Sequence, residues 1–394
     1  MHIVQETPRF PPAIGGVEEH VYRIYLELTR MGHKITVITS NEVDGKTYPL
    51  QEETVQGVKV YRFPLFSPKT LREYWIMPAA TKILRNVRCD VIHAHGYRCL
   101  ISCTAIYVAR VRNIPTVFTP HGIYPPRSVA NAFLKSAFDS TLGRLLLKFS
   151  NKVIALSENN LHLLLKLGVS PEKVAIVGNG VDLEEFEKIQ EGEGLSNQLD
   201  FSGSPIILYV GRIDWNKRID KVVHAMPLIL DEFPSAKFVI VGPDYSNYAK
   251  NLLDLAKRLN VENSIIITGR VSREKLRKFY SVADVFMLPS SYEGFGISLL
   301  EAMASKIPVI VYPSGGPSDF LRHCSNAWFL KSVEPHEIFT AVCTLLTRHD
   351  LRIKLVDSAF ELVRKYYTWK AIARRLESIY ESVRKENYNG SLSL

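Results

Sequence analysis

Two glutamates, Glu293 and Glu301, stand eight positions apart in the segment 289–303 and are the most informative feature of the chain. We expect a hydrophobic strand over 284–288, then a glycine-bearing loop, then a helix that begins near Gly296. Loop amides at a helix N-terminus favour a phosphate, because the unpaired N–H groups and the helix dipole attract an anion. A carboxylate can accept two sugar hydroxyls at once. The spacing therefore suggests a ribose and a second sugar on either side of a pyrophosphate; the alternative is a helix-terminal charge beside a solvated glutamate.

Two cations form the second candidate. Arg212 and Lys217 follow the strand expected at 206–210, at the end where α/β folds bind ligands. Cations near a helix N-terminus oppose the helix dipole, so their presence suggests a compensating anion. They could hold a diphosphate and stabilise it as a leaving group. Plain surface charge is the alternative.

Three histidines stand at or near strand ends in the first half: His93, His95 and His121. His95 and His121 each precede a glycine, where the backbone opens, whereas His93 is expected to pack inside its strand. A single histidine is usually structural, but two at equivalent strand ends favour contact with a ligand. A zinc site is not expected, because no cysteine or third histidine is placed to complete a ligand set. Asn179 lies in a glycine-flanked turn, where it either adopts left-handed geometry or offers its amide to a ligand.

Three further loops could contact a ligand. The loop before the first helix carries Gly15 and Gly16, but it lacks both the dinucleotide fingerprint and the P-loop lysine, and a plain tight turn is the alternative. Arg270 follows another strand and could border a base pocket. The segment 314–319 is glycine-rich and also follows a strand.

Size and composition indicate an ordinary two-domain protein of the α/β class. The chain has 394 residues and 46% hydrophobic content, enough for two full cores. Five cysteines without metal-ligand spacing predict free thiols in a reducing compartment. No apolar run approaches a membrane span and the N-terminus opens into a strand, so we expect a cytoplasmic protein without a signal peptide. The cysteines are Cys89, Cys99, Cys103, Cys324 and Cys343.

The net charge of +9 is unevenly distributed. Residues 62–152 hold 14 lysines and arginines against three acids. Such a sector suggests an anionic acceptor or docking on the anionic inner face of a membrane. The alternative is that these cations lie on ordinary solvated helix faces. The stretch 131–152 alternates cations with apolar residues and is either an interfacial or a core segment.

Strand-like and helix-like segments alternate along the whole chain, which predicts parallel sheets covered by helices. The composition of 190–204 is that of a linker. We therefore expect a domain over 1–190, a linker over 191–204, a second domain over 205–368, and a C-terminal helix with a polar tail over 369–394 that crosses back to the first domain. Strands are expected near 3–4, 35–39, 58–63, 91–94, 116–119, 153–155, 175–177, 206–210, 238–241, 264–268, 285–288 and 309–311.

Taken together, these motifs resemble the retaining GT-B glycosyltransferases of family 4 (glycosyl transferases group 1). The resemblance runs in order over nearly the whole chain, and its most specific parts are the Gly-Arg-x4-Lys motif and the E-x7-E box. It implies two Rossmann-like domains that face each other across a cleft. The motifs that carry it are Gly15-Gly16-Val17-Glu18, His95-Gly, Pro120-His121-Gly, Gly178-Asn-Gly-Val-Asp, Gly211-Arg212, Lys217, Gly269-Arg-Val, Glu293-Gly-Phe-Gly, Glu301 and Gly315-Gly316.

The resemblance also implies roles. Arg212 and Lys217 would contact the diphosphate, Glu293 the hydroxyls of the transferred sugar, and Glu301 the ribose. His121 would lie beside the sugar and, with Glu293, form the catalytic pair. The other residues assigned to the donor are Gly16, Arg270, Gly294, Phe295 and Gly296, with His95 and Asn179 as acceptor or sugar contacts. One departure is that Asp319 stands near the position where family members often carry glutamate.

The expected activity is transfer of a mannose- or glucose-type hexose from a UDP- or GDP-sugar to a glycolipid, a polyprenyl-linked saccharide or a polysaccharide. Neither a metal nor another cofactor is implied. A nucleotide-sugar epimerase of the same fold and a non-catalytic anion-binding subunit are the alternatives. No ribonucleoprotein or helix-turn-helix pattern supports binding to nucleic acid.

Overall fold

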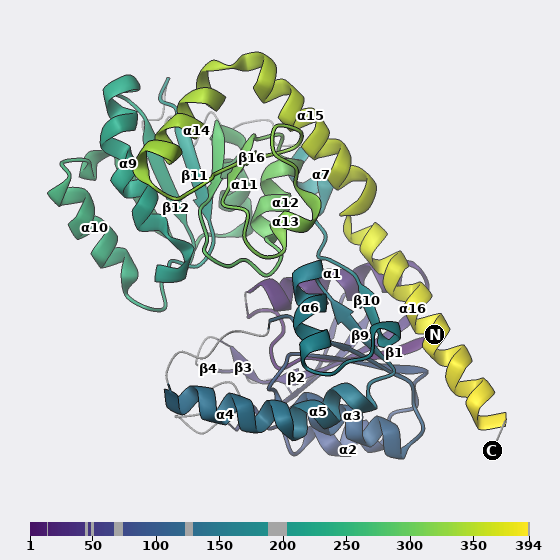
Figure 1. Ribbon diagram of the computed structural model, residues 1–394. Helices are drawn as coiled ribbons and strands as arrows, with labels where there is room; N and C mark the ends of the chain where they lie inside the picture. The colour runs from purple at the N-terminus through teal and green to yellow at the C-terminus, as the bar shows by residue number, and fades with distance from the viewer. Residues whose placement is uncertain are drawn as a thin grey trace. The chain divides into compact units, whose positions relative to one another are not determined.

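The computed structural model describes residues 1–13, 15–43, 46–48, 51–66, 74–122, 129–187 and 203–392. The chain divides into two compact units (Figure 1): unit 1 comprises Met1–Asn179 and Trp369–Leu394, and unit 2 comprises Gly180–Thr368. Residues 191–202 of the expected linker lie outside the described residues. All five cysteines are free thiols, as expected.

Unit 1 is built on a sheet of eight strands in the order β10-β9-β8-β7-β1-β2-β6-β5. Every neighbouring pair is parallel except β5 and β6. The chain builds β1, β2 and β6 in one direction and then returns to place β7 on the other side of β1. The order therefore reverses between β1 and β7, where doubly wound sheets bind ligands. The strands are β1 His2–Glu6, β2 Lys34–Ser40, β5 Glu52–Val55, β6 Val58–Phe63, β7 Val91–His95, β8 Thr116–Thr119, β9 Lys152–Ala155 and β10 Val174–Ile176, with a separate hairpin of β3 Glu42–Val43 and β4 Lys46–Thr47.

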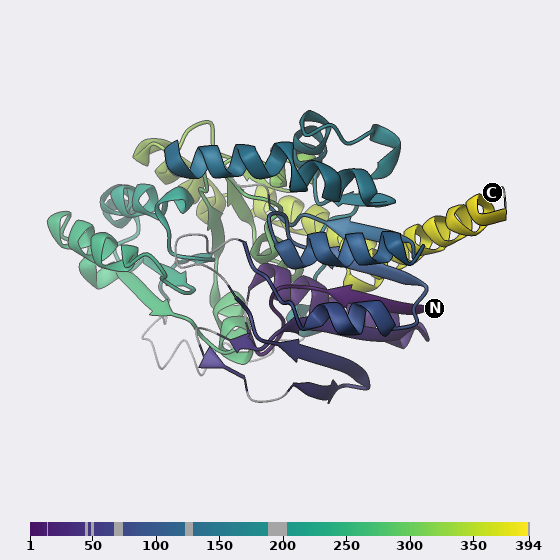
Figure 2. The ribbon, with the colours of Figure 1, turned by 90° about the horizontal axis from the view of Figure 1, so that it is seen from below.

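Helices cover both faces of this sheet because both faces of the central strands are apolar. One core joins the strands to the helices of residues 80–149, which Figure 2 shows together on their side of the sheet. The other core joins the strands to α1 and α16, which pack against each other. The helices are α1 Gly16–Arg30, α2 Ala80–Asn86, α3 Leu100–Val111, α4 Val129–Ser140, α5 Leu142–Phe149, α6 Glu158–Lys166 and α16 Trp369–Leu392.

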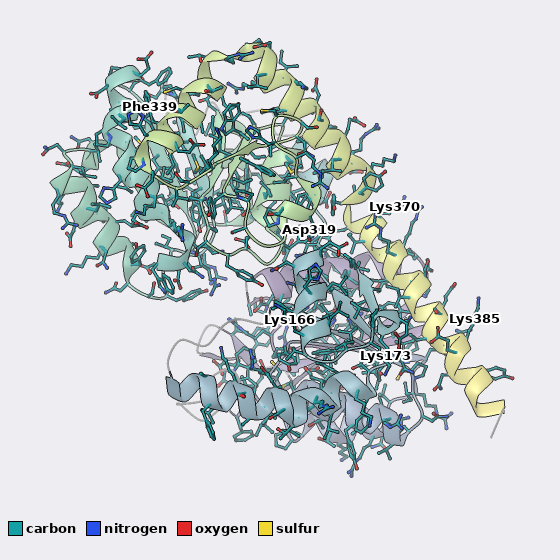
Figure 3. All side chains as sticks on the ribbon, viewed as in Figure 1. Lys166, Lys173, Asp319, Phe339, Lys370 and Lys385 are labelled. Carbon is teal, nitrogen blue, oxygen red and sulfur yellow. The ribbon has the colours of Figure 1, made fainter. Side chains whose placement is uncertain are left out.

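The C-terminal helix α16 is amphipathic and belongs to unit 1. Its buried side includes Trp369, Leu376 and Tyr380, whose side chains lie in the core shared with α1. Lys370 and Lys385 are exposed and point away from that core (Figure 3). The row of apolar positions explains why one side of this helix is buried in a core.

Unit 2 has a six-stranded, all-parallel sheet in the order β13-β12-β11-β14-β15-β16. Here the order reverses between β11 and β14. The strands are β11 Ile206–Val210, β12 Lys237–Val241, β13 Ile265–Gly269, β14 Val285–Leu288, β15 Val309–Val311 and β16 Trp328–Phe329. The helices are α7 Leu183–Glu187, α9 Ile219–Glu232, α10 Tyr248–Arg258, α11 Arg273–Val282, α12 Ile297–Ala304, α13 Pro317–Phe320, α14 Pro335–Thr347 and α15 His349–Tyr366.

The α/β class and the doubly wound sheets are confirmed. All twelve expected strands are present, with bounds that differ by a few residues at most. The strand β5 was missed because its sequence, Glu-Glu-Thr-Val, is largely polar and it lies at the sheet edge.

Candidate functional site

The cations expected near the end of β11 occupy a sharp turn in unit 2. A short 3₁₀ helix, Trp215–Lys217, follows the strand, and α9 begins only at Ile219 because Arg218 takes a left-handed conformation. This turn directs Lys217 inward: the residue is 8% exposed. Its Nζ donates a hydrogen bond of 2.6 Å to Oε2 of Glu293. The two residues that the sequence analysis assigned to the diphosphate and the sugar are therefore an ion pair.

Glu293 lies on the loop between β14 and α12, directly against the loop that follows β15. A Cβ added to Gly315 would lie 2.1 Å from the carbonyl oxygen of Glu293, and one added to Gly316 would lie 2.3 Å from that of Gly294. The Gly316 N–H donates to the Glu293 carbonyl over 2.9 Å. The segment 315–316 thus touches the backbone of the Glu293 loop at two positions that cannot carry a side chain, which fixes the position of Glu293.

Glu301 lies in α12, just over one turn beyond Gly296, which caps the helix with φ +91°. The side chain is buried, and both of its oxygens have partners. Arg273 donates to Oε1 over 2.5 Å and the Tyr280 hydroxyl donates to Oε2 over 2.8 Å. Arg273 also donates to Glu185 over 2.7 Å, so one guanidinium joins two carboxylates. The buried acid is therefore held in a fixed orientation.

Arg273, Tyr280 and Glu185 were missed by the sequence analysis. A signal for Arg273 existed: it is the first residue of α11, where a cation opposes the helix dipole. Arg273 thus stands near a helix start in the same way as Arg212 and Lys217.

The remaining residues assigned to the donor differ in exposure. Arg212 and Arg270 are exposed at the carboxyl ends of β11 and β13. Phe295 is 5% exposed, and its ring packs on Phe320 and Tyr367 with centroids 5.3 and 5.8 Å apart. Its side chain is thus a core group rather than an exposed donor contact.

Asp319, labelled in Figure 3, lies half-buried in the short helix α13. That helix directly follows the Gly315-Gly316 segment of unit 2.

In unit 1, the predicted histidines cluster where the strand order reverses. His93 is buried within β7, as expected, with Nδ1 at 2.7 Å from the Tyr380 hydroxyl and Nε2 at 2.8 Å from Thr119 Oγ1. His95 is equally buried. Its Nδ1 lies 2.9 Å from Nε2 of His121, and its Nε2 lies 2.6 Å from Oε1 of Gln5 on β1.

A third histidine completes this cluster, so the premise that no third histidine is placed near the other two was wrong. His20 of α1 is 1% exposed, and its ring lies 4.8 Å from that of His121 between centroids. Its Nδ1 is 2.6 Å from Oδ1 of Asn179. His20, His95 and His121 together form a group with the geometry to hold a metal ion. The signal was helical spacing, since His20 lies one turn before Ile24 on the buried face of α1.

Burial keeps these imidazoles neutral near pH 7. It lowers the pKa of His20 to about 4 and holds the pKa values of His93, His95 and His121 well below the usual range. Neighbouring histidines add a smaller repulsion for three of them. His121 also has a left-handed backbone, with φ +59°, which is uncommon outside glycine. Gly16 is the first residue of α1, on the same helix as His20.

The basic sector of residues 62–152 is only partly a surface charge. Arg62 is 1% exposed and pairs with Glu53 over 2.7 Å. Arg98 is buried and pairs with Asp139 over 2.8 Å, and Lys135 is 3% exposed. The count of cations therefore overstated the charge available to an anionic partner.

Both halves of the chain match families of glycosyltransferases. Residues 199–362 match the family described as glycosyl transferases group 1, and residues 14–185 match glycosyltransferase family 4. An uncharacterized glycosyltransferase of Methanocaldococcus jannaschii is 30% identical over 97% of this chain and 98% of its own length. The gpi3 subunit of phosphatidylinositol N-acetylglucosaminyltransferase of Schizosaccharomyces pombe is 26% identical over 96% of this chain and 80% of that protein.

The fold is shared with solved structures. One of them is HepE of Anabaena, solved in complex with UDP. The two structures superpose with a TM-score of 0.81 over 97% of this chain and 100% of the HepE chain, at 19% sequence identity. Among the described residues of this chain, no helix has the length and apolarity to cross a bilayer. The matched families, the shared fold and the paired acids and cations at the carboxyl ends of the strands lead to one conclusion: the chain belongs to glycosyltransferase family 4, has the GT-B fold and is a glycosyltransferase that uses a nucleotide-sugar donor.

Proposed function

We propose that this protein transfers a hexose from a UDP- or GDP-sugar to a lipid-linked or saccharide acceptor with retention of the anomeric configuration. The observation that carries the proposal is the Lys217–Glu293 ion pair, which lies next to the point where the strand order of unit 2 reverses. A cation for a diphosphate and an acid for sugar hydroxyls are thereby fixed at adjacent positions.

The diphosphate end of the donor needs cations that do not have to move during the reaction. The ammonium group of Lys217 has three donors, so one can remain on Glu293 while another binds a phosphate oxygen. Among the described residues, no hydrogen bond or ion pair engages the Arg212 guanidinium. This residue is exposed to solvent, so its guanidinium could contact a phosphate. These fixed charges would stabilise the leaving diphosphate without a divalent ion.

The nucleoside end is assigned to Glu301. Arg273 and Tyr280 each occupy one of its oxygens, but each oxygen can accept a second hydrogen bond. A ribose with two adjacent hydroxyls would bind this carboxylate through its two oxygens. The nucleotide base is best tested first as uracil, because HepE was solved with UDP.

At the sugar, the C1–O bond to the diphosphate breaks, and a C1–O bond to the acceptor forms on the same face. The acceptor hydroxyl loses its proton to the departing phosphate oxygen, so no enzyme nucleophile is needed. His121 is assigned a position beside the sugar. As a neutral imidazole it adds no positive charge next to the oxocarbenium-like carbon, and this neutrality follows from its lowered pKa.

A lipid acceptor is favoured by the name of the fission yeast relative and by the surface of α4 and α5. Phe133 is 75% exposed, and Leu134, Leu142 and Leu145 are each at least 40% exposed. Arg144, on α5, is also exposed. Apolar side chains beside a cation suit the boundary of an anionic membrane.

Donor assays test the activity. The purified protein is incubated with UDP-glucose, UDP-N-acetylglucosamine or GDP-mannose, with and without lipid acceptors and with a chelator present. Transfer that retains the anomeric configuration supports the proposal. An epimerised donor formed without acceptor would instead indicate an epimerase, and binding without any turnover would indicate a binding subunit.

Vesicle binding tests the membrane surface. Phe133→Ser and Leu145→Ser should each weaken binding to anionic vesicles, and moderate salt should weaken the binding of all forms. Ile353→Ser is the matched control, because Ile353 is 48% exposed on α15 of unit 2. Equal and negligible binding to anionic and neutral vesicles would exclude the membrane surface while leaving the transfer reaction untouched.

A further inference from the structure

The histidine cluster of unit 1 has the composition of a metal site. The three possible ligand atoms of His20, His95 and His121 all lie within 4.8 Å of one another. They come from three different elements: α1, the end of β7, and the residue pair that follows β8. A helix and two neighbouring strands therefore converge on one small volume.

Two of these histidines have outer partners that leave a lone pair for the centre. His20 Nδ1 is 2.6 Å from Asn179 Oδ1, so this nitrogen carries the hydrogen and Nε2 does not. His95 Nε2 donates to Gln5 Oε1 over 2.6 Å, so its Nδ1 is an acceptor and receives the His121 Nε2 hydrogen over 2.9 Å. Before His121 Nε2 can bind an ion, that hydrogen must move to His121 Nδ1, which converts this ring to its other neutral tautomer. Metal-bound histidines usually donate their second N–H to such an oxygen, which fixes the ring and its tautomer.

His20 Nε2 is the atom that most needs a partner. It is buried and makes no hydrogen bond among the described residues. A buried polar atom without a partner is costly and rare. A bound cation would give this nitrogen a partner.

The three nitrogens would have to shift to hold a small transition metal, because they lie up to 4.8 Å apart. Nitrogen ligands at the usual zinc distance lie about 3.3 Å apart in a tetrahedral site. The 2.9 Å between His95 Nδ1 and His121 Nε2 would open slightly, and His20 would move inward. His121 is partly exposed, whereas His20 and His95 are buried. Imidazole ligands favour zinc, copper, iron or nickel over magnesium or calcium.

We propose that His20, His95 and His121 bind one divalent transition metal ion of the zinc class, with Asn179 and Gln5 orienting two of the ligands. The proposal is independent of the donor site in unit 2. One consequence does rest on the proposed function: an ion that occupies His121 Nε2 would compete with its contact to the sugar, so excess zinc should inhibit transfer.

Metal titration of the chelator-treated full chain tests the site. Zn²⁺ should bind with one equivalent per chain, and Co²⁺ should give the visible absorption of a tetrahedral nitrogen site. His20→Gln and His121→Gln should each abolish the Co²⁺ signal. Asn179→Ala should weaken Zn²⁺ binding by about 10–100-fold, because only an orienting partner is lost.

The controls separate binding from folding. His162→Gln changes an exposed histidine on α6 and should bind Zn²⁺ as the unchanged protein does. Thermal unfolding with chelator present establishes whether each variant is folded. If His20→Gln does not fold, Asn179→Ala still tests the site, because it keeps all three ligands. The proposal is overturned if the unchanged protein shows no saturable Zn²⁺ binding or binds Mg²⁺ with equal affinity. It is also overturned if folded His20→Gln, or Asn179→Ala, binds Zn²⁺ as tightly as the unchanged protein.

Discussion

Replacing Lys217 by alanine should separate the catalytic role that we propose for the Lys217–Glu293 pair from its structural role. Lys217 is 8% exposed and donates over 2.6 Å to a carboxylate that is itself largely buried. Its removal has two effects: the diphosphate loses a fixed cation, and Glu293 is left as an unpaired acid where the donor's negative charge must bind.

The two effects have different magnitudes. One preorganised donor at a developing negative charge contributes about 10²–10³-fold to kcat, or about 3–4 kcal/mol. The uncompensated acid would add repulsion, so we expect a loss of about 10³-fold in kcat/KM. The free energy of unfolding should fall by only about 1–2 kcal/mol, because the pair retains some contact with solvent.

The assay compares Lys217→Ala with Glu293→Gln and with the double variant, by initial rates and by denaturant unfolding. The double variant removes both charges, so it should recover most of the lost stability but none of the lost activity. Lys278→Ala is the matched control, because it breaks an exposed ion pair with Glu274 in the same unit and should change activity by less than about twofold. Restored activity in the double variant would refute the assignment of Lys217 to the diphosphate.

Three further predictions concern stability. Gly315→Ala should destabilise unit 2 by more than about 2 kcal/mol in denaturant unfolding, because the added Cβ would meet the Glu293 carbonyl. Gly203→Ala is the control: this glycine has the same φ of +72°, no described atom lies within 4 Å of the added Cβ, and only the backbone strain should appear. Tyr380→Phe should cost unit 1 about 1–3 kcal/mol, measured in the same way, because His93 Nδ1 loses its hydrogen-bond partner in the core. Burial raises the pKa of Glu6 to about 8, above its ordinary 4.5, so the folded state keeps a proton that the unfolded state releases and stability should fall as pH rises between those values. Glu6→Gln should abolish that decline in thermal unfolding at a series of pH values; an unchanged pH profile would contradict the burial argument.

The sheets were predictable because each strand is an apolar run bounded by turn residues. The stretch 206–210 reads Ile-Ile-Leu-Tyr-Val and is fully buried, so its composition alone identifies an interior parallel strand. The short strand β16 has two residues, too few for any periodicity. We expected the C-terminal helix to cross back to the first domain, but its apolar pattern alone does not identify its partner, because α16 and α15 are both amphipathic. The partner of each helix depends on contacts far apart in sequence.

The proximity of Glu293 and Glu301 was predictable because both lie in one short segment of the chain. Glu293 and Glu301 belong to one loop and the helix that follows it, so spacing alone places them. Their partners belong to other elements: Lys217 follows β11 and Arg273 begins α11. A linear sequence shows that these cations exist but not which acid each one meets, because pairing depends on the order of strands in the sheet.

The pairing pattern bears on how the donor would be held. Lys217 already neutralises Glu293, and Arg273 already joins Glu301 to Glu185, so these cations do not present their whole charge to a diphosphate. Attraction for the donor must then come largely from Arg212 and from the amides at the N-terminus of α12. Removing Arg212, which is exposed and therefore screened by salt, should raise the donor KM more at low ionic strength than at high. Removing Lys217 should instead lower kcat at any salt concentration, because its largely buried charge stabilises the leaving diphosphate rather than attracting the free donor from solution.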